Sequence, residues 1–223
     1  MPIDGGASSA AGGANPNASY FSLDFYRQYF DVDTEQILHR LARAFMPWRP
    51  FLTEEDSKAD LYGPFWLATT LVFLVGVAGN LVSYLAYLPS DKTPVWRYDM
   101  QKLTSAASMF YGAITLLPLA ASTVLYRLLS IDELPLSTLL CLWGYSLASF
   151  VPVSLLCIIP SDIFHYLVFA VGLAFSAGFL VRQIQPVIPA DKMQPYGYAL
   201  LGGIVAAQFG IIVACKVYFF NFS

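Results

Sequence analysis

Five long stretches of this sequence contain no Asp, Glu, Lys or Arg. They cover residues 64–88, 103–126, 136–159, 163–181 and 196–215 and are 19 to 25 residues long. A helix needs about 20 apolar residues to cross a hydrocarbon core of roughly 30 Å. The stretches are apolar all round, whereas a helix of a soluble protein keeps a polar face. The sequence therefore predicts an all-α polytopic membrane protein whose five transmembrane helices occupy residues 64–215.

Composition agrees with insertion in a lipid bilayer. Hydrophobic residues make up 57% of the 223-residue chain and charged residues 12%, and the mean hydropathy is +0.58, outside the range usual for soluble domains. The N-terminus lacks the basic start and apolar run of a cleavable signal peptide, so targeting is expected to rest on the first span. The net charge is -3 and no basic stripe is present, which predicts no nucleic-acid partner.

Few residues inside the spans could support chemistry. Cys141, Cys157 and Cys215 have no metal-ligand spacing, so we expect no metal and no cofactor. Ser146 and His165 could form a hydrolase pair, but helix geometry places them about 20 Å and 5 Å below the intervening loop. We therefore expect no catalytic residues and no enzyme activity. The polar residues Asn80 and Gln208 are too few to predict an ion path.

The region before the first span divides into two parts. Residues 1–19 are rich in Gly, Ala, Ser and Asn and are expected to be a disordered tail. Residues 20–63 are expected to form a cytoplasmic region with a short amphipathic helix, capped by Asp33 with Gln36 and closed by Pro47.

The helix wheel of that segment has two faces. Ile37, Leu38, Leu41 and Phe45 share one, and His39, Arg40 and Arg43 share the other. Three arrangements remain open: the helix lies on the membrane surface, packs on the spans, or holds a partner.

The distribution of basic residues favours a cytoplasmic N-terminus. With five spans the termini lie on opposite sides, and a cytoplasmic N-terminus gives eight Lys and Arg inside against four outside, or five against four near the membrane. Residues 216–223 would then be a short lumenal tail. Glycosylation of the Asn17 sequon would reverse this topology.

The fifth span carries small residues at every fourth position, namely Gly202, Ala206, Gly210 and Ala214. Such a stripe lets helix backbones approach closely. It is equally consistent with packing inside the bundle and with association with another membrane protein.

The segment DLYGPFW, residues 60–66, reads as a membrane-entry device. Gly63 suits a turn before the helix, and Pro64 suits its first turn. Tyr62 and Trp66 fit the interfacial aromatic belt. Asp60 is expected to face water beside the helix N-terminus.

Several motifs together resemble the YIPF family of five-span, Ypt/Rab-interacting proteins. They are YFDVDT at 29–34, DLYGPFW at 60–66, GN at 79–80 and YSL followed by IIP within 145–160. The similarity runs from about Tyr20 to the C-terminus and looks most like the late-Golgi branch. The family-motif residues, which are also candidates for a partner surface, are Asp31, Asp33, Asp60, Leu61, Tyr62, Gly63, Pro64 and Trp66.

The resemblance implies a cytoplasmic N-terminus, no catalysis and a role in vesicle-mediated transport at the Golgi, with possible cycling to the ER or endosomes. It implies Rab-type small GTPases and a sister YIPF protein as partners, besides the lipid bilayer. Our leading hypothesis is a scaffold for these partners. The alternative is a small channel, transporter or lipid-handling protein, which would be favoured if Asn80, His165 and Gln208 lined one cavity.

Overall fold

The computed structural model describes residues 32–46, 51, 59–88, 97–131, 134–159 and 161–220. All the regular secondary structure in these parts of the chain is helical. Several residues named above lie outside the described parts of the chain: the tail of residues 1–19 with Asn17, Asp31, Pro47 and residues 221–223. The elements are α2 (Thr34–Ala44), α3 (Tyr62–Tyr87), α4 (Met100–Arg127), α5 (Leu136–Ser146), η2 (Leu147–Ser149), α6 (Phe150–Leu156), α7 (Asp162–Ile184), η3 (Gln185–Val187), η4 (Met193–Gly197) and α8 (Tyr198–Tyr218).

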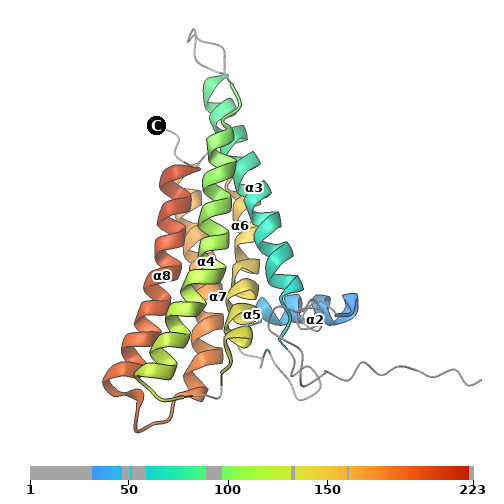
Figure 1. The fold of residues 1–223 in the computed structure, drawn as a ribbon. Coiled ribbons are helices and arrows are strands. Elements are labelled where there is room, and N and C mark those ends of the chain that lie inside the picture. The colour runs from blue at the N-terminus through green and yellow to red at the C-terminus, as the bar shows by residue number, and fades with distance from the viewer. Residues whose placement is uncertain are drawn as a thin grey trace, which may run out of the picture.

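Five helical segments are long and apolar enough to cross a membrane, which confirms the predicted fold class. They are Tyr62–Leu85, Met100–Arg127, Leu136–Leu156, Ile163–Val187 and Met193–Tyr218. Figure 1 shows them as a bundle of alternating direction. The starts of α3, α5 and α8 therefore lie at one end with α2, and the C-terminus of the chain lies towards the other end.

The third span is not one continuous helix. A 3-10 turn, η2, separates α5 from α6, and the hydroxyl of Ser149 donates to the backbone oxygen of Ser146 at 3.2 Å within it. The break has a local sequence cause in Pro152, which has no N–H to donate to the backbone oxygen of Ala148 four residues earlier and whose ring crowds that oxygen. Pro118 sits inside α4, where it is buried.

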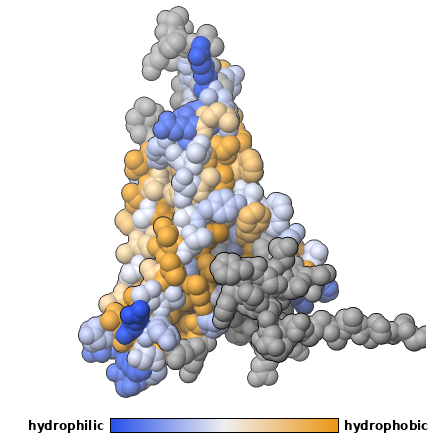
Figure 2. All heavy atoms as spheres, in the orientation of Figure 1, coloured by the Kyte–Doolittle hydropathy of each residue, from blue (hydrophilic) through white to orange (hydrophobic). Residues whose placement is uncertain are grey.

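The interior is apolar and forms two clusters of buried side chains. One joins α3 to α4, α6, α7 and the end of α8, with Leu71, Phe110 and Phe150 among its members. The other lies nearer α2 and joins α5 to the ends of α4 and α7, with Trp143 and Phe179 among its members. On the face of the bundle visible in Figure 2, apolar residues predominate along the middle and strongly hydrophilic residues gather towards the two ends, as expected for membrane-spanning helices.

The amphipathic helix α2 lies crosswise at the end of the bundle, beside the start of α5 (Figure 1). Of the three arrangements left open by the sequence, the structure has the one that packs on the spans. The helix starts after Asp33, as predicted, but the Asp33 side chain makes no capping hydrogen bond, so the predicted capping box is wrong in that respect. Its buried residues are Arg40 and Ala44, while Leu38 is 61% exposed.

Candidate functional site

A buried ion pair joins α2 to the entrance of the first span. The Arg40 guanidinium donates through Nη1 to Oδ2 of Asp60, and the two side chains are 2% and 1% exposed. Breaking such a pair leaves an uncompensated charge in a low-dielectric site. Asp60 is therefore not in water, and the prediction that it faces solvent is wrong because Arg40, 20 residues earlier, neutralises it inside the fold.

The Asp60 carboxylate also organises the first turn of α3. Its Oδ1 accepts a hydrogen bond from the backbone N–H of Gly63 at 2.9 Å, which satisfies a donor that the helix itself leaves open. The Tyr145 hydroxyl donates to Oδ2 at 3.3 Å, and the Cys141 thiol lies 3.7 Å from the same atom. Three segments far apart in sequence thus meet on one carboxylate.

Two pairs of residues interlock α3 and α5 beside this carboxylate. A Cβ atom placed on Gly63 would lie 2.1 Å from the Tyr145 hydroxyl oxygen, and one placed on Gly144 would lie 2.2 Å from Cβ of Pro64. Gly63 is the second residue of α3 rather than part of a preceding turn. Its absent side chain makes room for Tyr145, so the reason predicted for this glycine is wrong.

Phe51 is a second attachment point at this end of the bundle. It is fully buried, with ring centroids 5.0 Å from Tyr145 and 5.2 Å from Phe179. Its backbone N–H donates to Oε1 of Gln183 at 3.2 Å, and its oxygen accepts from Arg43 at 3.3 Å. Phe51 is therefore held by α5 and α7 as well as by α2.

The electrostatic environment keeps the Arg40 side chain charged. Burial is the largest single influence and disfavours the guanidinium cation. Attraction to the Asp60 carboxylate, the hydrogen bond to it and smaller contributions from Cys141 and Tyr145 together outweigh burial and raise the pKa of Arg40 above its ordinary value. The arrangement is therefore a buried ion pair that joins the amphipathic helix α2 to the membrane bundle.

The remaining motif residues lie at different places. Asp33 is exposed at the start of α2, Leu61 is half-buried, and Pro64 is buried against Gly144. Tyr62 and Trp66 are 37% and 51% exposed on the outside of α3. Their position in the interfacial aromatic belt stays a prediction.

The GN motif acts at the opposite end of the bundle. Asn80 accepts from the backbone N–H of Asp99 at 2.8 Å and donates to the Asp99 oxygen at 3.1 Å, which fixes the start of α4 to α3. Lys102, which the sequence placed before the second span, lies in the first turn of α4. Its ammonium donates to the Gly79 oxygen at 2.9 Å.

The three polar residues that would mark a channel are engaged in separate contacts. Asn80 binds the start of α4, while His165 Nε2 lies 2.8 Å from the oxygen of Ile159. Gln208 donates to the Ser146 hydroxyl at 3.2 Å. None of the three lines the pocket between α4, α5 and α8 or the pocket between the end of α4 and the start of α5. The single cavity lined by all three that would favour the channel alternative is therefore not seen at either of these places.

The hydrolase pair is not assembled either. Ser146 donates to the Trp143 oxygen at 2.7 Å and accepts from Gln208. His165 lies in the first turn of α7, where its Nε2 contacts the Ile159 oxygen. Across the described parts of the chain, no group of three or more His, Cys, Asp or Glu side chains could hold a metal ion.

The small-residue stripe of the fifth span faces outward. Gly202, Ala206, Gly210 and Ala214 are all exposed, and a Cβ atom added at Gly202 or Gly210 would meet nothing within 4 Å. The stripe therefore does not pack against the described parts of this chain, and association with another membrane protein stays a prediction.

Sequence reasoning did not find Arg40, Cys141, Tyr145 or Phe51 as members of the site. Arg40 was placed on the polar face of α2, and nothing local distinguishes it from Arg43. The sequence did carry a signal for Tyr145, because the YSL motif that begins there belongs to the same family pattern as DLYGPFW. The contact itself spans 85 residues in sequence.

Comparison with known proteins agrees with this architecture. Residues 47–215 match the model of the Yip1 domain. The chain is 33% identical over 209 residues to "Protein YIPF1 homolog" of Dictyostelium discoideum, covering 93% of this chain and 58% of that protein. It is 31% identical over 167 residues to "Protein YIP5" of Schizosaccharomyces pombe, covering 71% of this chain and 65% of that protein.

The chain thus spans less than two thirds of the length of these two relatives. No solved structure matches it. The Yip1 domain match covers the first four spans and all but the last three residues of the fifth. It includes every motif that carries the resemblance except YFDVDT, which precedes it. The chain is therefore a multi-pass membrane protein that belongs to the YIPF family.

Proposed function

We propose that the chain is a non-catalytic membrane scaffold in vesicle-mediated transport, located at the Golgi and in the early secretory pathway and closest to the late-Golgi branch of its family. Its partners in this proposal are Rab-type small GTPases and a sister YIPF protein. Family membership supports the proposal.

The observation that carries the proposal is the attachment of α2. The Arg40–Asp60 pair and the buried Ala44 hold one face of the helix on the bundle. The opposite face presents Leu38, which is 61% exposed, next to Glu35 and His39, whose side chains are 82% and 65% exposed. An apolar side chain displayed beside charges on a fixed helix is the kind of surface that a protein partner recognises.

This assignment moves the partner surface away from the DLYGPFW motif. Asp60 is buried and serves the ion pair, and Gly63 and Pro64 serve the contact with α5. We therefore assign partner capture to the outward face of α2, defined by Glu35, Leu38 and His39, and assign the motif to holding that helix in place.

The proposed orientation puts α2 on the cytoplasmic side, where Rab-type GTPases are found. Arg127, Arg182 and Lys192 lie at the same end of the bundle as α2, as the positive-inside rule requires for that side. In this orientation Asn17 stays unglycosylated. If glycosidase treatment shifts the full chain on a gel and Asn17→Gln abolishes that shift, the N-terminus is lumenal and the proposed topology is wrong.

The test of the function is native co-purification of the full chain from Golgi membranes, followed by identification of Rab-type GTPases and sister YIPF proteins. Leu38→Glu is expected to reduce GTPase recovery at least about tenfold, a loss of about 1.4 kcal/mol. Gln36→Glu, an equal charge change at another exposed position of α2, is the matched control and is expected to keep recovery. Recovery of neither class of partner with the unaltered chain would reject the scaffold.

The outward stripe of α8 is the surface we assign to the sister protein. Gly210→Leu adds bulk at a position where an added Cβ atom would meet nothing within 4 Å. It is expected to reduce recovery of the sister protein while leaving GTPase recovery unchanged. Equal recovery of the sister protein with and without this substitution would remove the stripe from the proposal.

A further inference from the structure

The described helices lie closer together at one end of the bundle than at the other, so the bundle narrows away from α2 (Figures 1 and 2). At the narrow end α3 and α8 are in direct contact, because a Cβ atom placed on Gly79 would lie 3.1 Å from the Phe219 oxygen. The Ser105 hydroxyl donates to the Tyr218 hydroxyl at 3.2 Å, which joins α4 to α8 at the same end.

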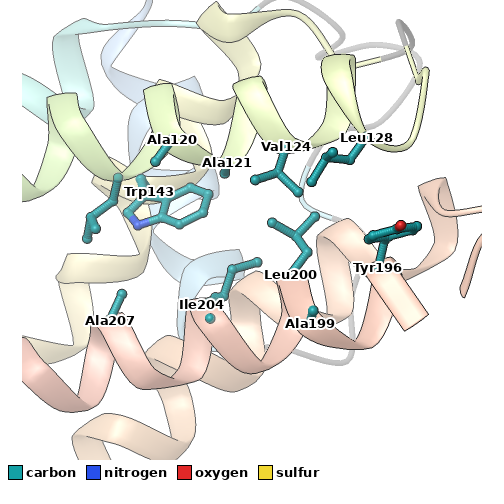
Figure 3. Close-up of a pocket in the computed structure, with 12 residues that line it drawn as sticks. Ala120, Ala121, Val124, Leu128, Trp143, Tyr196, Ala199, Leu200, Ile204 and Ala207 are labelled. Carbon is teal, nitrogen blue, oxygen red and sulfur yellow. The ribbon is translucent and has the colours of Figure 1, made fainter. Parts of the chain in front are cut away.

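The same helices are farther apart at the α2 end (Figure 1). Here the third span lies between α3 and α8, since Pro64 of α3 packs on Gly144 and Gln208 of α8 donates to Ser146. A groove with a volume of about 300 Å³ opens between the end of α4 and the start of α8. Figure 3 shows the side chains of α4 and α8 on opposite sides of this groove.

The helix α2 adds to the width of the α2 end. It has 11 residues and lies crosswise to the spans. A helix of this length is about 16 Å long and 10 Å wide, so it covers about 160 Å² of the membrane plane, against about 80 Å² for an upright helix. Within the described parts of the chain, no helix lies crosswise at the narrow end.

The position of α2 along the bundle places it at the level of the membrane surface. The start of α3 packs on Gly144, which is eight residues after Leu136, or about 12 Å along the third span. The Arg40–Asp60 pair ties α2 to this place. The exposed side chains of Glu35 and His39 require water or headgroups on the other face of α2. An amphipathic helix in this position occupies headgroup area in one leaflet.

A protein that occupies more area in one leaflet than in the other fits best where the first leaflet is expanded, which is the convex side of a curved bilayer. We propose that this chain concentrates in membranes that are convex on the α2 side. In the orientation proposed above that side is cytoplasmic, as on a budding vesicle. The preference follows from the shape of the chain and requires neither a GTPase nor a sister protein.

The sorting of molecules between flat and curved membrane tests the proposal. The full chain carries a fluorophore on its N-terminus and is reconstituted into giant vesicles of phosphatidylcholine, from which a narrow tube is pulled outward. The N-terminus lies on the α2 side, because residues 1–33 contain no apolar stretch long enough to cross the membrane. A membrane-impermeant quencher therefore separates the molecules with α2 outside from those with α2 inside.

The two orientations are expected to respond in opposite directions. Relative to a lipid dye, molecules with α2 outside should be at least about twofold denser in the tube than in the vesicle, which corresponds to about 0.4 kcal/mol. Molecules with α2 inside should be depleted from the tube, because their wide end lies in the concave leaflet. Equal densities in tube and vesicle, or the same enrichment for both orientations, would overturn the proposal.

Variants of the full chain test the part played by α2. Asp60→Ala breaks the ion pair, and Ala44→Glu places a charge at the buried contact of α2. Each is expected to remove at least about half of the excess density in the tube, because the helix is no longer held at the membrane surface. His39→Ala alters an exposed pair on the same helix and should keep the full excess. An unchanged excess in both Asp60→Ala and Ala44→Glu would show that α2 does not cause the sorting.

Discussion

Asp60 and Arg40 form an ion pair that is almost completely inaccessible to solvent, although both residues lie in the polar region that precedes the first span. A buried pair adds little net stability over a well-packed apolar pair, but losing one partner is costly because the other charge stays buried. Its value here lies in position: it fixes which face of α2 meets the bundle and which face remains exposed.

The first prediction contrasts two ion pairs that α2 makes, a buried one between Arg40 and Asp60 and an exposed one between Glu35 and His39. Asp60→Ala is expected to destabilise the protein by about 3–5 kcal/mol, because it strands the Arg40 charge. Combining Asp60→Leu with Arg40→Met is expected to recover part of this loss, because no buried charge remains. The Gly63 N–H and the Tyr145 hydroxyl still lose their acceptor, so recovery is not complete. The measurement is thermal or denaturant unfolding of the full chain in detergent micelles.

The control for this prediction is the exposed pair of Glu35 and His39, 3.7 Å apart. His39→Ala is expected to change the free energy of unfolding by less than about 1 kcal/mol, as is usual for exposed pairs. An Asp60→Ala effect no larger than that of His39→Ala would show that the Arg40–Asp60 contact is not buried in the membrane-embedded protein.

The second prediction concerns the contact between α3 and α5. Gly144→Ala places a methyl group 2.2 Å from Cβ and 2.6 Å from Cα of Pro64, and a backbone atom cannot move aside cheaply. We expect a loss of about 1–3 kcal/mol in unfolding free energy. Gly178→Ala, with nothing within 4 Å of the added methyl, is the control and is expected to be neutral or stabilising. Similar melting temperatures for the two variants would contradict the interlock.

The third prediction concerns the clamp at the other end of the bundle. Asn80→Ala removes both hydrogen bonds to the backbone of Asp99. We expect a cost of about 1–3 kcal/mol and faster hydrogen exchange of the Asp99 amide. Ser108→Ala, which removes a bond within α4 only, should leave that amide unchanged. An Asp99 amide that exchanges at the wild-type rate in Asn80→Ala would contradict the clamp.

Sequence patterns were sufficient for the fold class. The charge-free stretches predict all five spans, since a bilayer imposes both length and apolar composition on each segment. The observed helices differ from the predicted spans at their ends, where a polar residue makes a hydrogen bond within the fold. Lys102, for example, lies inside α4 and donates to the oxygen of Gly79. The period of residues 34–44 also predicts a helix there, and the helix was found.

The candidate site could be predicted only in part. DLYGPFW was identified as a membrane entry, but whether Asp60 lies in water depends on Arg40 and Tyr145, which are remote in sequence. Orientation about a helix axis was also beyond the sequence for α8, because a span that is apolar on every side gives no periodic signal. Only the packed bundle distinguishes the outward Gly202 from the buried Ile204.

The central claim is that the Arg40–Asp60 pair holds α2 on the membrane bundle, and hydrogen–deuterium exchange of the full chain in nanodiscs tests it most directly. The amides of 38–44 are expected to be protected in the unaltered chain and to exchange at least about tenfold faster in Asp60→Ala. The amides of α3 and α5 should stay protected in both proteins. Equal exchange of 38–44 in the two proteins would contradict the claim.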